Sequence, residues 1–356
     1  MMFSFPAMAR STLAVAALVT VFAPSRPVHA QDAKATAPVA SAMAEAANKV
    51  IAALTPEQKA KVVLAFDDPS RVDWTNIPKP TRKGVQLREM SAEQQKLCHE
   101  LLKVTLSDQG YEKAVRIMSL ESNLNEGEKN LKNGPIRDPQ RYFLTIFGQP
   151  SDAGNWGWSF EGHHFSLNFV IRDGQVTAET PSFWGANPAT VKIFVEGGPK
   201  VGTRTLADEE QLAFQLVKSL DAQQSQVAII ADKAPNEYRA AGKPQPPQSG
   251  PEGLPAKKMT DEQKATLKGL VKTYIAHWAD PIAQKRLAEI EAAGWDDVHF
   301  AWLGATEPGV GHSYRIHGPT FILELINVQS DPAGNPANHI HSVWRDPRGD
   351  FSLTLK

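Results

Sequence analysis

The chain has 356 residues, of which 42% are hydrophobic, and its formal net charge is −1 at pH 7. A chain of this length can bury a large core, either in two domains or in one duplicated domain. Nucleic acids and anionic membranes are bound by concentrated basic charge, so the near-neutral balance argues against both as partners. The single cysteine, Cys98, excludes an intramolecular disulfide.

Residues 1–30 have the pattern of a secretory signal peptide. Arg10 precedes an apolar run at 13–22, two prolines follow, and Val28-His29-Ala30 forms a small-residue cleavage site. The apolar run is shorter than the roughly 20 residues that a membrane-spanning helix needs. We therefore expect cleavage near Ala30, a secreted or periplasmic protein, and no membrane span after processing.

The next segments predict a leader followed by helices. Residues 31–45 are rich in Ala, Thr and Pro, and we expect them to form a mobile leader. Three capping boxes then indicate helix starts, because each has a Ser or Thr three residues before a Gln. The boxes begin at Thr55, Ser91 and Thr260. We expect further helices at about 111–121, 205–219 and 281–293.

Residues 241–256 contain so much Pro, Gly and Gln that they predict an extended linker or a crossing strap. They would separate an N-terminal α+β half, residues 46–240, from a C-terminal α+β half, residues 257–356. In each half, a capping-box helix precedes a region with the alternating pattern of strands.

The strand regions of the two halves resemble each other. Residues 158–162 align with 314–318, the apolar positions after them align as well, and Ser182-Phe183-Trp184 resembles Ser342-Val343-Trp344. Similar order at three places indicates an internal duplication. The sequence therefore predicts an α+β fold with antiparallel sheets and flanking helices, built from two related halves.

Histidines supply the strongest chemical signal. His339 and His341 lie two residues apart in an expected strand, so their imidazoles point to the same face and suit a divalent metal such as zinc. The pair His163 and His164 opens a second expected strand, in which alternation places His164 on the polar face and His163 on the apolar face. The alternative is that these are strand or core-edge histidines without a ligand.

Carboxylates and other charged residues complete the set of candidates. Glu324 stands inside an apolar run, where a carboxylate needs a metal, a cation or several donors as its partner. Glu161 precedes the second histidine pair, and His312 follows a Gly-rich turn. Arg345 and Asp346 could bind an anion and orient a histidine, although the same residues also suit an ordinary turn.

At these residues the chain resembles a known family, the secreted domain of unknown function 3500 family. The resemblance covers the chain from about residue 50 to the C-terminus. It rests mainly on the stretches 156–169, 181–188, 306–324 and 337–347, with weaker support at 66–74 and 82–87. The resemblance implies no particular reaction, since the family name assigns none.

We expect an exported metal-dependent enzyme, most simply a hydrolase, with its site between the two halves and a small molecule or small polymer as substrate. His164, His339 and His341, with His163 as a further candidate, would bind the metal. Glu324 or Glu161 would be a ligand or general base, and Arg345 would stabilise developing negative charge.

Two alternatives stay open. One is a non-catalytic periplasmic or secreted protein that binds a metal or small ligand in a closed coordination shell. The other is a metal-free hydrolase or lyase in which His164 or His341 acts as acid and base.

Overall fold

The computed structural model describes residues 1–2 and 35–355. Most of the predicted signal peptide lies outside these residues. Within the described part of the chain, no helix combines the length and the apolar character that crossing a membrane requires.

Eight α-helices are formed by the described residues, and the predicted capping boxes at Thr55, Ser91 and Thr260 are all present. A fourth box, which the sequence analysis did not identify, has Asp221 as its first residue. The helices are α2 (Ala37–Ala53), α3 (Pro56–Val62), α4 (Ala92–Thr105), α5 (Asp108–Glu128), α6 (Ala207–Lys218), α7 (Ala222–Ala228), α8 (Asp261–Ile275) and α9 (Asp280–Ala293).

The structure corrects the prediction of a mobile leader at 31–45, because residues 37–45 form the first half of α2. The alanine-rich sequence favours a helix, and a proline in its first turn is compatible with helix initiation. Val39, Met43, Ala47 and Val50 share one face of α2 and are buried. The buried face anchors α2 to the core, which the alanine and proline content alone did not indicate.

All strands belong to one mixed sheet. Its main path runs β1-β3-β4-β5-β7-β13-β12-β11-β10-β8, and β2, β6 and β9 pair at its sides. Most pairs are antiparallel as predicted, whereas β1–β3 and β8–β10 at the two ends are parallel. The strands are β1 (Val63–Leu64), β2 (Val85–Gln86), β3 (Phe143–Gly148), β4 (Asn155–Gly162), β5 (Phe165–Arg172), β6 (Gln175–Ala178), β7 (Ser182–Ala186), β8 (Ile229–Ala231), β9 (Leu254–Pro255), β10 (His299–Gly304), β11 (His312–Gly318), β12 (Phe321–Asn327) and β13 (Ile340–Arg345).

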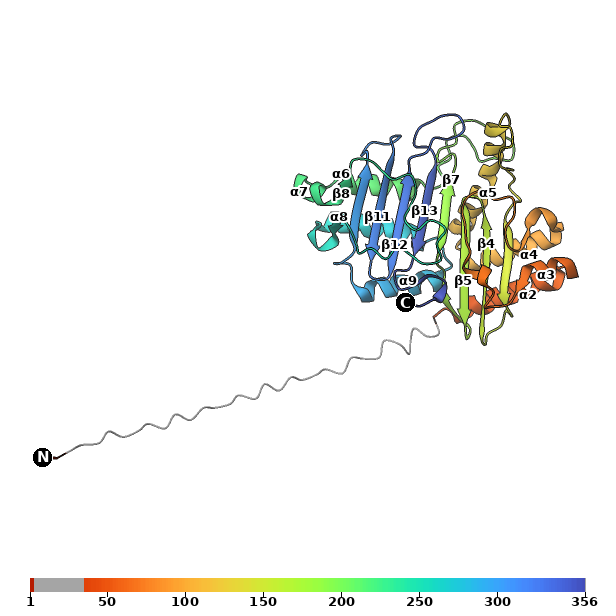
Figure 1. The fold of residues 1–356 in the computed structure, drawn as a ribbon, viewed down its shortest axis with the longest axis horizontal. Coiled ribbons are helices and arrows are strands. Elements are labelled where there is room, and N and C mark those ends of the chain that lie inside the picture. Colours follow the sequence, from red (N-terminus) through yellow and green to blue (C-terminus); the bar gives the residue numbers. More distant parts are fainter. Residues whose placement is uncertain (3–34, 356) are drawn as a thin grey trace.

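The order of elements occurs twice along the chain (Figure 1). Two helices, two short strands, two helices and then a run of antiparallel strands extend from α2 to β7 and again from α6 to β13, with five strands, β3 to β7, in the first run and four, β10 to β13, in the second. The two series, here called the first and second repeat, meet at the β7–β13 pair in the middle of the sheet. There Phe183 faces Val343, and Ser182 and Trp184 face Trp344 and Ser342.

This register is the one expected if a two-fold axis passes through the Phe183–Val343 pair, because each aligned triplet faces its own counterpart in reverse. A common origin of the two repeats stays a prediction. The Pro-rich residues 241–256 lie within the second repeat and lead into β9.

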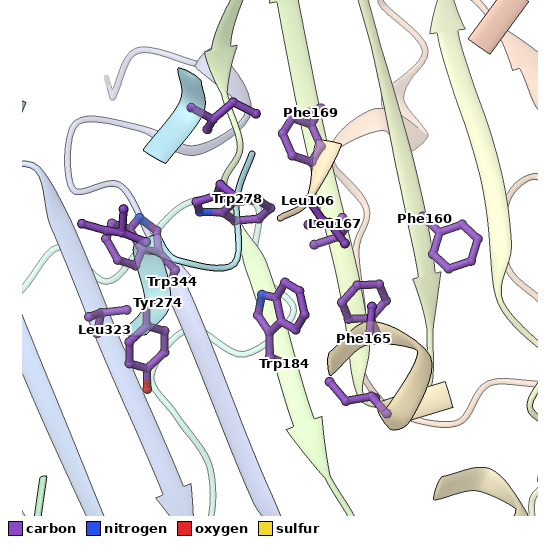
Figure 2. Close-up of a cluster of buried hydrophobic side chains, with 14 of the residues drawn as sticks. Leu106, Phe160, Phe165, Leu167, Phe169, Trp184, Tyr274, Trp278, Leu323 and Trp344 are labelled. Carbon is purple, nitrogen blue, oxygen red and sulfur yellow. The ribbon is translucent and has the colours of Figure 1, made fainter. Parts of the chain in front are cut away.

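The helices cover one face of the sheet (Figure 1) and build the main core with it, part of which is drawn in Figure 2. On this face Trp184 and Trp344 from the central strands pack with Tyr274 and Trp278 of the α8 region. Phe169 of β5 contacts the ring of Trp278 as well. The alternating apolar residues of the strands therefore point toward the helices, as period-two patterning dictates.

The opposite face is covered by two irregular segments. We call residues 65–84, between β1 and β2, the first strap, and residues 232–253, between β8 and β9, the second strap. Trp74 of the first and Tyr238 of the second pack with Phe183 and Val343 of the central strands in a small second core. The candidate site lies at the edge of this core.

Candidate metal centre

His164 is the second residue of the tight turn that joins β4 to β5. Gly162 and Phe165 pair across this turn, and His164 has a left-handed backbone with φ of 62°. Such a conformation costs a residue other than glycine about 1–3 kcal/mol, so surrounding contacts must hold it. Its N–H donates to the carbonyl of Asn76 at 3.0 Å, and its carbonyl accepts from Gly185 N–H at 2.8 Å.

Gly185 leaves room for the His164 ring, because a Cβ atom at this position would lie 3.1 Å from His164 Cδ2. The preceding residue His163, the first strap and β7 together fix the imidazole of His164. A strained backbone that is held on both sides is typical of functional sites.

His339 and His341 come from the other repeat. His341 lies in β13, opposite Gly185 of β7, and His339 immediately precedes this strand. The N–H of His339 donates to Asn327 Oδ1 at 3.0 Å, which ties the start of β13 to the end of β12. The two imidazoles lie on the strap face of the sheet, as the H-x-H spacing predicts.

The three imidazoles converge on one point. The Nε2 atom of His164 lies 2.8 Å from that of His339 and 3.3 Å from that of His341, and the last two are 3.0 Å apart. Ligand nitrogens at 2.0–2.1 Å around a tetrahedral metal lie roughly 3.3 Å from one another. The three nitrogens thus fit a divalent ion after opening by a few tenths of an ångström, and this histidine triad could hold a metal.

Burial favours the neutral form of His164 and His339. His164 is 2% exposed, His341 is 6% exposed, and His339 is the most accessible of the three. Burial lowers the pKa of His164 well below its usual value and lowers the pKa of His339 to about 3. Neutral imidazoles keep the lone pairs that metal binding requires.

The neighbours of two triad members face the Nδ1 side of their rings. Both carboxylate oxygens of Glu237, in the second strap, lie 3.0 Å from Nδ1 of His341. The side-chain amide of Asn187 lies 3.2 Å from Nδ1 of His339. Neither residue was predicted from the sequence: Glu237 lies in an irregular segment, and Asn187, within the stretch 181–188, directly follows β7 without a ligand-like spacing.

His163, the fourth predicted ligand, lies outside the triad. Its ring stacks on His164 with centroids 3.7 Å apart, while its Nδ1 faces Glu121 and Arg137. Burial raises the pKa of Glu121 to about 8, so this carboxyl is largely protonated at neutral pH. His163 therefore supports the ring of His164 and directs its nitrogens away from the triad.

The two predicted carboxylates are bound by cations. Glu324 accepts from Arg239 Nε at 2.8 Å and lies 3.4 Å from Arg315 Nε. Glu161 pairs with Arg82 and Lys83 of the first strap. A buried carboxylate does need a partner, as the sequence analysis argued, but these partners are basic side chains. Among the described residues, the convergent group of possible ligands contains the three histidines and neither glutamate.

The remaining candidates also have local partners. Arg345 binds Asp350 and donates to the carbonyls of Ala240 and Lys243 in the second strap. Asp346 pairs with Arg286 at 3.1 Å, in a buried cluster. The ring of His312 stacks on Trp302, and its Nε2 lies 3.2 Å from Glu210.

A cavity of about 410 Å³ has no triad residue in its lining. Arg137 lines it, together with the end of α5 and residues 194–196. Nη1 of Arg137 lies 2.9 Å from Nδ1 of His163, whose ring covers His164. Two side chains therefore separate the cavity from the histidine triad.

A family model described as "Protein of unknown function (DUF3500)" matches residues 36–353. No curated protein and no solved structure matches the chain. The matched region contains both repeats, both straps and all three triad histidines. The chain belongs to the DUF3500 family.

Proposed function

We propose that the protein is an exported metal-dependent hydrolase whose metal is bound by His164, His339 and His341. The observation that carries this proposal is the convergence of three imidazole Nε2 atoms within 3.3 Å of one another. A cation between these nitrogens would accept a lone pair from each of them.

The number of ligands favours catalysis over storage. Within residues 35–355, the group that can share a metal consists of three histidines, with no fourth His, Cys, Asp or Glu. Three protein ligands are typical of catalytic zinc sites, whereas four are typical of structural ones. A divalent metal held in this way supplies a Lewis acid and activates water at its open position.

The chain's own residues hold the rings and define the approach. The turn geometry and the stacked His163 fix His164, while β13 fixes His341. His339, the most accessible triad member, marks the side from which a substrate reaches the metal.

Metal analysis tests the proposal. The purified protein should contain about one divalent ion per chain by elemental analysis, and H339A/H341A should contain none while keeping its circular dichroism spectrum. The metal-loaded protein should cleave members of a panel of nitrophenyl carboxylic and phosphoric esters, and the double variant should cleave none.

The control is H299A, because His299 lies on β10 and contacts only the backbone of Asp297 through Nδ1. This variant should keep both metal and hydrolysis. Full metal occupancy without turnover on any ester would contradict the hydrolase and favour the binding protein. Hydrolysis that persists without metal would favour the metal-free enzyme instead.

A further inference from the structure

Glu237 has an environment that differs from those of Glu324 and Glu161, the two carboxylates predicted at the site. Its two oxygens face a histidine, Nδ1 of His341, each at 3.0 Å. In the described part of the chain, no Lys or Arg nitrogen lies within 4.0 Å of this carboxylate. By contrast, Glu324 and Glu161 are each bound by two basic side chains.

The two residues that follow Glu237 in the second strap hold it in place. The N–H of Tyr238 donates to Glu237 Oε1 at 3.0 Å, and the hydroxyl of Tyr238 donates to Asn76 Oδ1 at 2.8 Å. The next residue, Arg239, binds Glu324 through its backbone N–H and its side chain. A carboxylate that is 34% exposed is therefore fixed against His341 by the contacts of these two residues.

A carboxylate can only accept a hydrogen bond, so the short contact requires a proton on Nδ1 of His341. In a neutral imidazole, the other nitrogen then carries the lone pair. Nε2 is the atom of His341 that faces the other two histidines. Glu237 thus selects the tautomer that a metal needs.

Asn187 lies at the corresponding place beside Nδ1 of His339. Its Oδ1 is buried and without a hydrogen-bond partner, while its Nδ2 lies 3.2 Å from Nδ1 of His339. Turning the amide by 180° brings Oδ1 to Nδ1–H and satisfies both groups. Two of the three ligands are then held by acceptors in the tautomer that exposes Nε2.

We propose that Glu237 is a positioning residue that sets the metal affinity of the triad through His341. The proposal rests on the proposed function, because it presupposes that the triad binds a metal. The negative charge of Glu237 also makes Nε2 of His341 a stronger electron-pair donor to the metal. Partners of this kind contribute about 10–100-fold to metal affinity in known sites.

Competition with a chromophoric chelator tests this role in the full-length protein with Zn²⁺ and Co²⁺. E237A should bind both ions about 10–100-fold more weakly than the wild type. E237Q should recover part of the loss, because the amide oxygen still accepts from Nδ1–H. The visible spectrum of bound Co²⁺ should shift in both variants, since a ring with altered donor strength changes the ligand field.

The matched control is E252Q, in the same strap, where Glu252 pairs with Arg315 and Arg239 and forms no ion pair with a histidine among the described residues. It should bind as the wild type does, and all variants should unfold at similar urea concentrations without metal. Equal affinity of E237A and E252Q would overturn the role of Glu237 while leaving the metal site intact. Failure of the wild type to bind either ion would overturn the proposed function and this role together.

Discussion

Beneath the central strands, on the helix side, Lys113, Glu209 and His277 form a buried charged cluster. Glu209 Oε1 binds the Lys113 ammonium and lies 3.0 Å from His277 Nε2, and all three residues are at most 5% exposed. Lys113 belongs to α5 of the first repeat, whereas Glu209 belongs to α6 of the second. The cluster therefore links α5 of the first repeat to α6 of the second through direct side-chain contacts.

Glu209→Gln should lower the free energy of unfolding at pH 7 by about 3–5 kcal/mol, because it leaves the Lys113 ammonium buried without a counter-charge. The double variant K113M/E209L, which removes both charges, should regain much of this loss. Urea denaturation measures both effects. A single variant within about 1 kcal/mol of the wild type would show that water or another group neutralises Lys113.

The same cluster makes stability depend on pH. Burial alone would raise the pKa of Glu209, but His277 and Lys113 lower it to about 2, from 4.5. A carboxyl whose folded pKa is depressed contributes stability that is complete above pH 4.5 and is lost as the pH falls toward 2. Burial lowers the pKa of His277 to about 4, so further stability is lost between pH 6.5 and 4. Glu209→Gln should not show the part of the loss that occurs below pH 4.5.

Residue type and spacing were sufficient to predict the triad, but not its surroundings. The H-x-H pair and the alignment of the two strand regions pointed to His339, His341 and His164, and these do converge. Glu324 was predicted at the site because an apolar run surrounds it, yet cations from distant segments neutralise it. Glu237 could not be predicted, because an irregular strap has no periodicity that would show which side chains face the sheet.

At the scale of elements, Arg345 connects β13 to the second strap. Its guanidinium binds the fully buried Asp350, donates to Ala240 and Lys243, and lies over the ring of Trp74. These contacts fasten the strap, and with it Glu237, over the sheet. Each of the three guanidinium nitrogens therefore has a partner in the strap or in Asp350, and the predicted role of Arg345 in stabilising developing charge stays a prediction.

Arg345→Met should therefore act on stability. The substitution leaves the Asp350 carboxylate buried and unpaired, which should cost about 3–5 kcal/mol in urea denaturation. Metal affinity of the folded fraction should stay within about threefold of the wild type. The control is Arg348→Met, at a half-exposed arginine whose ion pairs contribute little. Unchanged stability together with lost hydrolysis would restore the predicted catalytic role of Arg345.

Local signals predicted some elements well and others poorly. The capping boxes correctly located the starts of α3, α4 and α8, because the box satisfies the free N–H groups within four residues of sequence. The prediction of a mobile leader was wrong for the first half of α2, because the formation of this helix depends on packing against distant elements. Long-range contacts of this kind leave no local pattern in the sequence.

At the scale of the whole molecule, the two repeats agree beyond the order of their elements. Gln94 of the Ser91 box binds Gln58 of the Thr55 box, and Gln263 of the Thr260 box binds Gln224 of the Asp221 box in the same way. The α4–α5 and α8–α9 junctions also face each other, through a bridge between Leu106 and Trp278. These correspondences support the predicted duplication, although the sequence could not show that the repeats share one continuous sheet.

If the repeats are equivalent, their order along the chain should matter little. Thr36 and Ser352 both contact the β5–β6 hairpin, at Val176 and Arg172, so the two ends of the fold lie near each other. A circular permutant opened at the exposed Val201-Gly202 turn, with residues 353 and 36 joined by about ten Gly and Ser residues, should fold. Circular dichroism and metal binding measure the result.

The control permutant is opened inside β12, between Leu323 and Glu324, and should not fold, because it interrupts a central strand. If the first permutant also fails to fold, residues 187–206, which connect the repeats, contribute to folding in a way that the linker between residues 353 and 36 does not replace. A shared two-fold plan would then not be enough to describe the molecule.

The triad takes one ligand from the first repeat and two from the second, and it sits beside the only strand pair that joins them within the described sheet. An ion bound there would exist only in the assembled state, so mass action would add about 2.7 kcal/mol of stability when free metal is a hundredfold above its dissociation constant. The concentration of free metal would then determine the stability of the β7–β13 pair that joins the repeats. Without metal, the repeats would separate first at the β7–β13 pair, and the freed edges of these two strands would be exposed to proteases.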